Sequence, residues 1–201
     1  MRKSIFRVRR HRACLSTIAV SAAVLGACAG NDPVTIDRTY VTHVYSRSLV
    51  VGANQYDSTK LEVVGQPFGA PAERVQARVR ESIQGIGLLD TIDLTTGRAD
   101  ARSPYRLIVQ FAPARDLNHF RVCKGQRKTR SDARGAPVSL MMTYCLGDDP
   151  VTSLRARRGG ISSLADPRFD DLLRQAAKVA FMPGHEALRA GPDGGNGGSF
   201  P

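Results

Sequence analysis

Side chains with catalytic or metal-binding potential are scattered through this sequence and do not form a motif. His185 and Glu186 begin like a zinc-protease helix, but Arg189 stands where the second histidine is required. Asp116 and His119 could serve as a base and its orienting group, yet no nucleophile signature accompanies them. No Gly-rich phosphate loop and no Gly-x-Ser-x-Gly elbow is present either. We therefore expect no catalytic residue, no metal site and no cofactor.

A cluster of basic residues is the feature of the sequence that suggests a binding site. The segment 124–134 contains five basic residues and one acid. Its candidate binding residues are Lys124, Arg127, Lys128, Arg130 and Arg134. A second cluster follows at Arg155, Arg157 and Arg158. Near a membrane, such a loop can contact the phosphates of lipid A or of phospholipid headgroups, or cell-wall carboxylates. A solvated, mobile loop is the alternative.

The net charge of +11 at pH 7 is distributed unevenly along the chain. Six basic residues lie in the first twelve positions, whereas all 18 acidic residues lie after residue 31. Without the N-terminal segment, 23 basic and 18 acidic residues remain, a net charge of +5. This moderate excess does not indicate a nucleic-acid partner.

The N-terminus has the organisation of a secretory signal. A basic region, 1–12, precedes an apolar stretch of 14 residues, 13–26, which is too short to span a bilayer. The stretch ends in Leu25-Gly26-Ala27-Cys28. Here the sequence resembles bacterial lipoproteins, whose lipobox reads Leu, small residue, Gly or Ala, Cys. An ordinary signal peptide that is cleaved near Ala27 is the alternative.

The lipoprotein resemblance implies a membrane anchor at Cys28. It implies that the Cys28 thiol is diacylated, that the chain is cleaved before Cys28 and that the new N-terminus is acylated. Two or more acyl chains give durable membrane attachment. Residue 29 is Ala, and in this family the absence of Asp there favours transfer to the outer membrane. We therefore expect an outer-membrane lipoprotein that faces the periplasm.

Export would leave two cysteines in an oxidising compartment. Cys14 departs with the signal and Cys28 carries the lipid, so Cys123 and Cys145 remain as a disulfide candidate. A plain hairpin of two strands, 117–123 and 138–145, would hold their Cα atoms roughly 25 Å apart, too far for a bond. The disulfide therefore requires either that the segment 124–136 runs back along the sheet or that one of the two strands is assigned wrongly. Two separate buried thiols are the alternative.

The remaining chain alternates strand and helix patterns. Val75, Val79, Ile83 and Ile86 recur at helical spacing after Pro71, and Asp166-Pro167 is typical of a second helix start. The predicted strands are 35–51, 61–64, 105–111, 119–123, 138–146 and 151–157. We expect an α+β fold: a two-layer sandwich of a mainly antiparallel sheet, four or five strands, with two helices on one face.

These observations define the expected organisation and role. Residues 1–27 form the signal peptide, 28–33 a lipidated tether, 34–189 the periplasmic domain and 190–201 a disordered Gly-rich tail. The element order is similar to that of small periplasmic lipoprotein domains of unknown function, and to a lipopolysaccharide-assembly lipoprotein that plugs an outer-membrane barrel. We expect a non-enzymatic domain that binds an anionic envelope component or an envelope protein. A lipid-handling assembly factor and a hydrolase without a visible motif are the alternatives.

Overall fold

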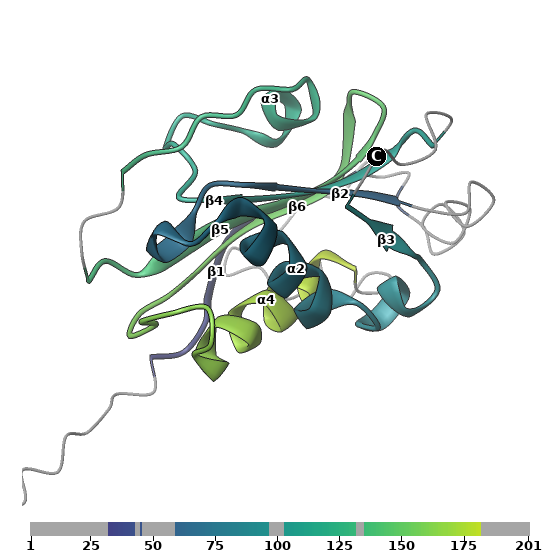
Figure 1. Ribbon diagram of the computed structural model, residues 1–201. Helices are drawn as coiled ribbons and strands as arrows, with labels where there is room; N and C mark the ends of the chain where they lie inside the picture. The colour runs from purple at the N-terminus through teal and green to yellow at the C-terminus, as the bar shows by residue number, and fades with distance from the viewer. Residues whose placement is uncertain (1–31, 43–44, 46–58, 97–102, 132–134, 182–201) are drawn as a thin grey trace, which may run out of the picture.

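Six strands form one open sheet in the part of the chain that the computed structural model describes, residues 32–42, 45, 59–96, 103–131 and 135–181 (Figure 1). Their order across the sheet is β1-β6-β5-β4-β2-β3. The strands are β1 (Thr35–Val41), β2 (Thr59–Val64), β3 (Leu94–Thr95), β4 (Tyr105–Phe111), β5 (Val138–Leu146) and β6 (Asp149–Arg158). The predicted α+β class is confirmed.

The sheet is mixed, and this corrects the expectation of four or five mainly antiparallel strands. β2 lies parallel to both β3 and β4, whereas the other neighbouring strands pair antiparallel. A parallel pair needs a crossover connection, and the chain supplies it through the helix α2 (Ala72–Ile83) between β2 and β4. The two-residue strand β3 was not predicted because it is too short to show a period.

Two long helices cover one face of the sheet (Figure 1), but the prediction of two helices in all is not exact, because a third, short helix spans His119–Cys123. The predicted apolar face of α2 is buried, with Val75, Val79 and Ile83 all inaccessible. The helix α4 (Pro167–Ala180) begins at the predicted helix start, Asp166-Pro167. The Asp166 side chain caps it by accepting a hydrogen bond from the Arg168 amide. Asp170 of α4 joins the helices by accepting bonds from Arg78 at 2.5 Å and Ser82 at 2.7 Å.

The segment His119–Cys123, predicted as a strand, is instead the short helix α3. Its start is fixed by Asn118, whose side-chain oxygen accepts from the Arg121 amide at 3.0 Å. The adjacent residues Val122 and Cys123 are both buried. Consecutive strand residues point to opposite faces, so only a helical turn buries both against one surface. Figure 1 shows α3 on the face of the sheet opposite α2 and α4, so this region has a third, partial layer.

Several further boundaries differ or lie outside the described residues. The predicted strand 35–51 is shorter, since β1 ends at Val41 and the described residues Thr42 and Tyr45 lie outside it, and the predicted strand 151–157 is longer, since β6 begins at Asp149. The N-terminal signal, the tether to residue 31, Arg134, His185, Glu186 and the C-terminal tail lie outside the described residues. Within the described ranges, no helix is long and apolar enough to cross a membrane.

A candidate anion-binding site

Residues 113–130, here called the cover segment, lie over the sheet face that the two long helices leave uncovered. The segment leaves β4 and returns beside it, because Pro113 and Thr129 form an antiparallel bridge and Ala114 donates its amide to the Lys128 carbonyl at 3.0 Å. A small apolar cluster lies beneath it, formed by Ile108, Leu117, Val122, Cys123, Met141 and Cys145. The cover segment is therefore packed on the sheet and is not a solvated hairpin loop.

The predicted disulfide between Cys123 and Cys145 fixes this arrangement. It joins α3 to β5, and the two Cα atoms lie 5.7 Å apart. Both conditions stated above hold: the segment after Cys123 runs back along the sheet towards Thr129, and the predicted strand that ends at Cys123 is the helix α3. In the chain-entropy account, a loop of this length stabilises the folded state by about 3 kcal/mol.

Polar side chains of the sheet bind the backbone of the cover segment. Arg106 donates to the Cys123 carbonyl at 2.7 Å, and Gln110 donates to the Lys128 carbonyl at 2.6 Å. Arg155 donates one guanidinium nitrogen to the carbonyls of Ala114 and Leu117, at 2.9 and 2.5 Å. These bonds tie the backbone of the cover segment to the sheet beneath it.

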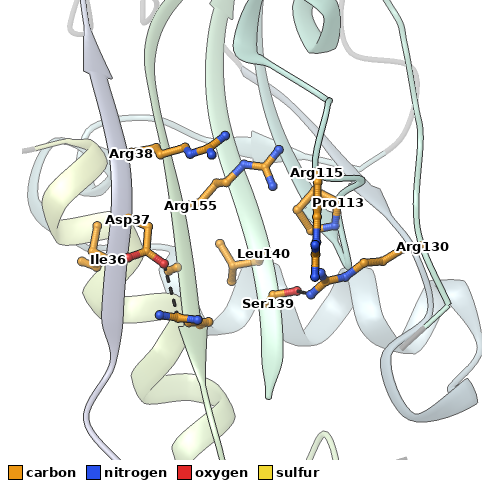
Figure 2. Close-up of a pocket in the computed structure, with 11 residues that line it drawn as sticks. Ile36, Asp37, Arg38, Pro113, Arg115, Arg130, Ser139, Leu140 and Arg155 are labelled. Atoms are coloured by element: carbon orange, nitrogen blue, oxygen red, sulfur yellow. Dashed lines mark hydrogen bonds and ion pairs between the residues drawn. The ribbon is translucent and has the colours of Figure 1, made fainter. Parts of the chain in front are cut away.

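A cavity of about 540 Å³ opens beside the cover segment, and arginines dominate its lining. Five of the eleven lining residues are arginines, and the one acidic residue is Asp37. The arginines are Arg38, Arg115, Arg130, Arg155 and Arg157. We call this cavity the arginine pocket. Figure 2 shows four of them, Arg38, Arg155, Arg115 and Arg130, projecting from β1, β6 and both ends of the cover segment around one space.

Strand pairing and a bulge place the β1 and β6 arginines. Asp37 lies opposite Arg155, and the register between β1 and β6 shifts between Asp37 and Tyr40. Within this bulge, Arg38 has a φ of 54°, a left-handed conformation that costs a non-glycine residue about 1–2 kcal/mol. Strained backbone of this kind gathers at functional sites. The bulge directs Arg38 towards Arg155 (Figure 2).

Positive charge exceeds negative charge among the residues that line the pocket. Burial lowers the pKa of Arg155, and the nearby charges of Arg38 and Arg130 lower it further. Arg157 pairs with Asp37 at 3.3 Å, and Arg130 donates to the Ser139 hydroxyl at 3.1 Å. Guanidinium groups stay protonated at all physiological pH values. The site is therefore suited to hold an anion.

The described residues of the predicted basic loop, 124–134, make different contacts in the folded protein. Arg127 forms an ion pair with Glu62 at 2.7 Å, and Lys128 lies 3.5 Å from Asp116. Burial raises the pKa of Glu62, but hydrogen bonds from Arg127 and Lys60 outweigh it and the net pKa falls below the ordinary value. Of the predicted loop residues, Arg130 lines the pocket, Lys124 is exposed and Arg134 lies outside the described residues.

The arginines of the second cluster also lie on different faces, because successive residues of a strand point to opposite sides of the sheet. Arg155 and Arg157 line the pocket, whereas Arg158 points to the other face and pairs with Asp171 of α4. Sequence reasoning missed Arg38 and Arg115, because each is isolated along the chain from both basic clusters. Arg38 lies within a run of residues with high β-propensity, and a charged side chain in such a run is the sequence feature that could have indicated this pocket residue.

Asp116 and His119 do not form a catalytic pair. Asp116 lies beside Lys128 and Arg121, at 3.5 and 3.9 Å, and its pKa is lowered first by its own backbone amide and then by Lys128. The His119 ring instead stacks on Tyr40 with ring centres 4.0 Å apart, and burial lowers its pKa. Among the described residues there is no group of three His, Cys, Asp or Glu side chains that could hold a metal ion.

A second cavity, of about 790 Å³, shares Arg130 and Ser139 with the arginine pocket. Its other lining residues include the apolar side chains Pro67, Phe68, Phe111, Ala136, Val138 and Ile161. Phe68 is 42% exposed, an unusual state for a large aromatic side chain. We call this second space the apolar cavity.

Comparison with known proteins adds little to this geometry. No protein-family model and no curated protein matches the chain. Two crystal forms of the PelC dodecamer from Paraburkholderia phytofirmans, one of them a variant with a single substitution, are similar in structure with 11 and 12% identity and a TM-score of 0.41. Each match covers 72% of this chain and 94 or 95% of the PelC chain. A likeness this weak carries no argument about function.

Proposed function

We propose that this protein is a membrane-anchored periplasmic lipoprotein that binds an anionic component of the envelope and catalyses no reaction. The arginine pocket is the observation that carries the proposal, because five arginines and one carboxylate line a single cavity of about 540 Å³. A charge excess of this kind attracts an anion and raises its local concentration.

The envelope setting rests on the N-terminal sequence and gains support from the disulfide. The lipobox ends at Cys28, and disulfides form and persist in oxidising compartments such as the periplasm. Arg38 follows Cys28 by ten residues, so even a fully extended chain holds it within about 35 Å of the lipidated residue. The proposed anchor would keep the arginine pocket near the membrane surface.

The test is affinity purification of the full chain from detergent-solubilised envelope, with bound lipids and other anions identified. The pocket variant is Arg38→Gln/Arg115→Gln, because neither side chain has a hydrogen bond or ion pair to another described residue. The control is Arg74→Gln/Arg174→Gln, which removes the same charge from exposed positions on α2 and α4. We expect the wild type and the control to retain an anionic species that the pocket variant loses.

Two outcomes would count against this proposal. One is the same set of bound molecules on the wild type and the pocket variant. The other is turnover of an ester, phosphate or peptide substrate by the purified protein, which would favour a hydrolase. The proposal also predicts that retention weakens as salt is added, since the attraction between exposed charges is screened.

Lipid handling is a second candidate function, and the apolar cavity favours it. Because the two cavities share Arg130 and Ser139, an anionic headgroup in the arginine pocket could place an acyl chain against Phe68. Mass spectrometry of co-purified material would then find acyl chains, and Phe68→Ser would lower their amount. Bound anions without acyl chains would agree with the anion-binding function and exclude lipid handling.

A further inference from the structure

The charge balance of the arginine pocket indicates how much negative charge its ligand must bring. Asp37 is engaged by Arg157 at 3.3 Å. Arg38 and Arg115 line the same space, and neither forms an ion pair with a carboxylate of the described residues. A single carboxylate would neutralise one of these two arginines. A ligand with two negative charges on one compact group fits this excess better.

The directions of the donors also favour one kind of anion. Arg38, Arg155, Arg115 and Arg130 approach from β1, from β6 and from both ends of the cover segment. A carboxylate offers two oxygens in one plane, which one or two guanidinium groups saturate, whereas a terminal phosphate offers three oxygens in a tetrahedral arrangement. Ser139 accepts a bond from Arg130, so its own hydroxyl hydrogen can donate to a further oxygen.

We propose that the arginine pocket binds a terminal phosphate group, that is, a phosphate monoester, with Arg38, Arg115 and Arg130 as its main contacts. Arg155 acts as a positioning residue, since one of its nitrogens already donates to the Ala114 and Leu117 carbonyls. The cavity of about 540 Å³ is much larger than phosphate alone and leaves room for the group that bears it. This inference rests on the proposed function and specifies its ligand.

The charge of the ligand gives the proposal a pH signature. A phosphate monoester has a second pKa of about 6, so it changes from one to two negative charges between pH 5 and pH 7.5. Guanidinium groups keep their charge over this range, and the pKa of Asp116 is lowered, so this carboxylate also stays charged. Lys128 and Arg121 lie beside Asp116, and His119 is the titratable group that stacks on Tyr40 of β1. Protonation of His119 at low pH would strengthen anion binding, which is the opposite trend.

The experiment is calorimetric titration of the full chain, purified in a nonionic detergent, at pH 5 and pH 7.5. The soluble probes are glycerol 3-phosphate, which is a monoester, glycerophosphoglycerol, which is a diester, and succinate. The lipid probes are phosphatidic acid and phosphatidylglycerol in the same micelles. We expect the two monoesters to bind at least tenfold more tightly than their diester partners at pH 7.5. Their affinity should fall by about tenfold at pH 5, while the diester affinity stays constant or rises.

The variants and the paired probes separate the possible outcomes. Arg115→Gln and Arg38→Gln should each weaken monoester binding by tenfold or more, and Arg74→Gln should not. Phosphatidic acid binding more tightly than glycerol 3-phosphate identifies a lipid headgroup as the source, and the reverse order identifies a soluble phosphate. Equal or tighter binding of succinate or of the diesters would overturn the monoester assignment but keep the proposed function. No binding of any probe, together with no anion on the purified protein, would overturn both.

Discussion

Arg38 brings a positive charge into the arginine pocket in a backbone conformation that lowers the stability of the fold. Its φ of 54° suits glycine far better than a side chain with a Cβ atom. Its guanidinium also lies near Arg155, whose pKa it lowers. Both the backbone conformation and the charge repulsion oppose the folded state, and a binding role explains why an arginine stands there.

Replacing Arg38 with glycine should therefore stabilise the protein while weakening anion binding. We expect Arg38→Gly to raise the free energy of unfolding by about 1 kcal/mol, since glycine adopts positive φ without a steric penalty. Chemical denaturation and an anion titration would measure the two effects on one sample. Arg38→Lys is the matched control, because it keeps the charge and the strain. A glycine variant that is less stable than the wild type would contradict this account of the bulge.

The elements show where sequence patterns were sufficient. The periodic apolar residues Val75, Val79 and Ile83 predicted α2, and Asp166-Pro167 predicted the start of α4. In both, the local signal and the tertiary packing agree. For the segment 119–123 they do not: its apolar residues fit a strand pattern, but contact with the sheet and the Asn118 cap select a helix. A five-residue helix has too few turns to show its period.

The candidate site was predictable only in fragments. Arg130 and Arg155 were recognised in two separate basic clusters, and nothing in the spacing indicated that they meet. Their meeting depends on the pairing of β5 with β6 and on the return of the cover segment over the sheet. Arg38 and Arg115 enter the pocket through a bulge and a loop, two features that leave no periodic signal in the sequence.

The disulfide should couple the stability of the fold to anion binding, because the cover segment carries both Arg115 and Arg130. We expect Cys123→Ala/Cys145→Ala to lower the melting temperature by about 6–12 °C, given about 3 kcal/mol for a domain of this size. Anion affinity should also fall, as the cover segment is less firmly held. Differential scanning calorimetry and titration would measure both.

Reduction provides the control for this prediction. Dithiothreitol should shift the wild-type melting temperature towards that of the double variant and leave the double variant unchanged. Two free thiols in non-reduced wild-type protein, counted by intact mass after alkylation, would show that the bond is absent in solution.

For the whole molecule, the proposed anchor gives the simplest test. Cys28→Ser should abolish incorporation of radiolabelled fatty acid and release the protein from the membrane fraction, because the lipobox thiol is the expected acylation site. Fractionation of labelled cells would measure both effects. A Cys14→Ser variant is the control, since that residue lies in the expected signal peptide. Unchanged labelling of Cys28→Ser would refute the lipobox interpretation.

The bulge in β1 also affects how one molecule meets another. Among the described strands, β1 ends the hydrogen-bonded order of the sheet, and an exposed end strand can template pairing with a neighbouring chain. The register shift between Asp37 and Tyr40 breaks the regular ladder in the middle of this strand, and a bulge also twists the strand locally. A second strand could not add along the full length of β1 unless the bulge were first straightened, so the same irregularity that presents Arg38 also protects the protein against edge-to-edge aggregation.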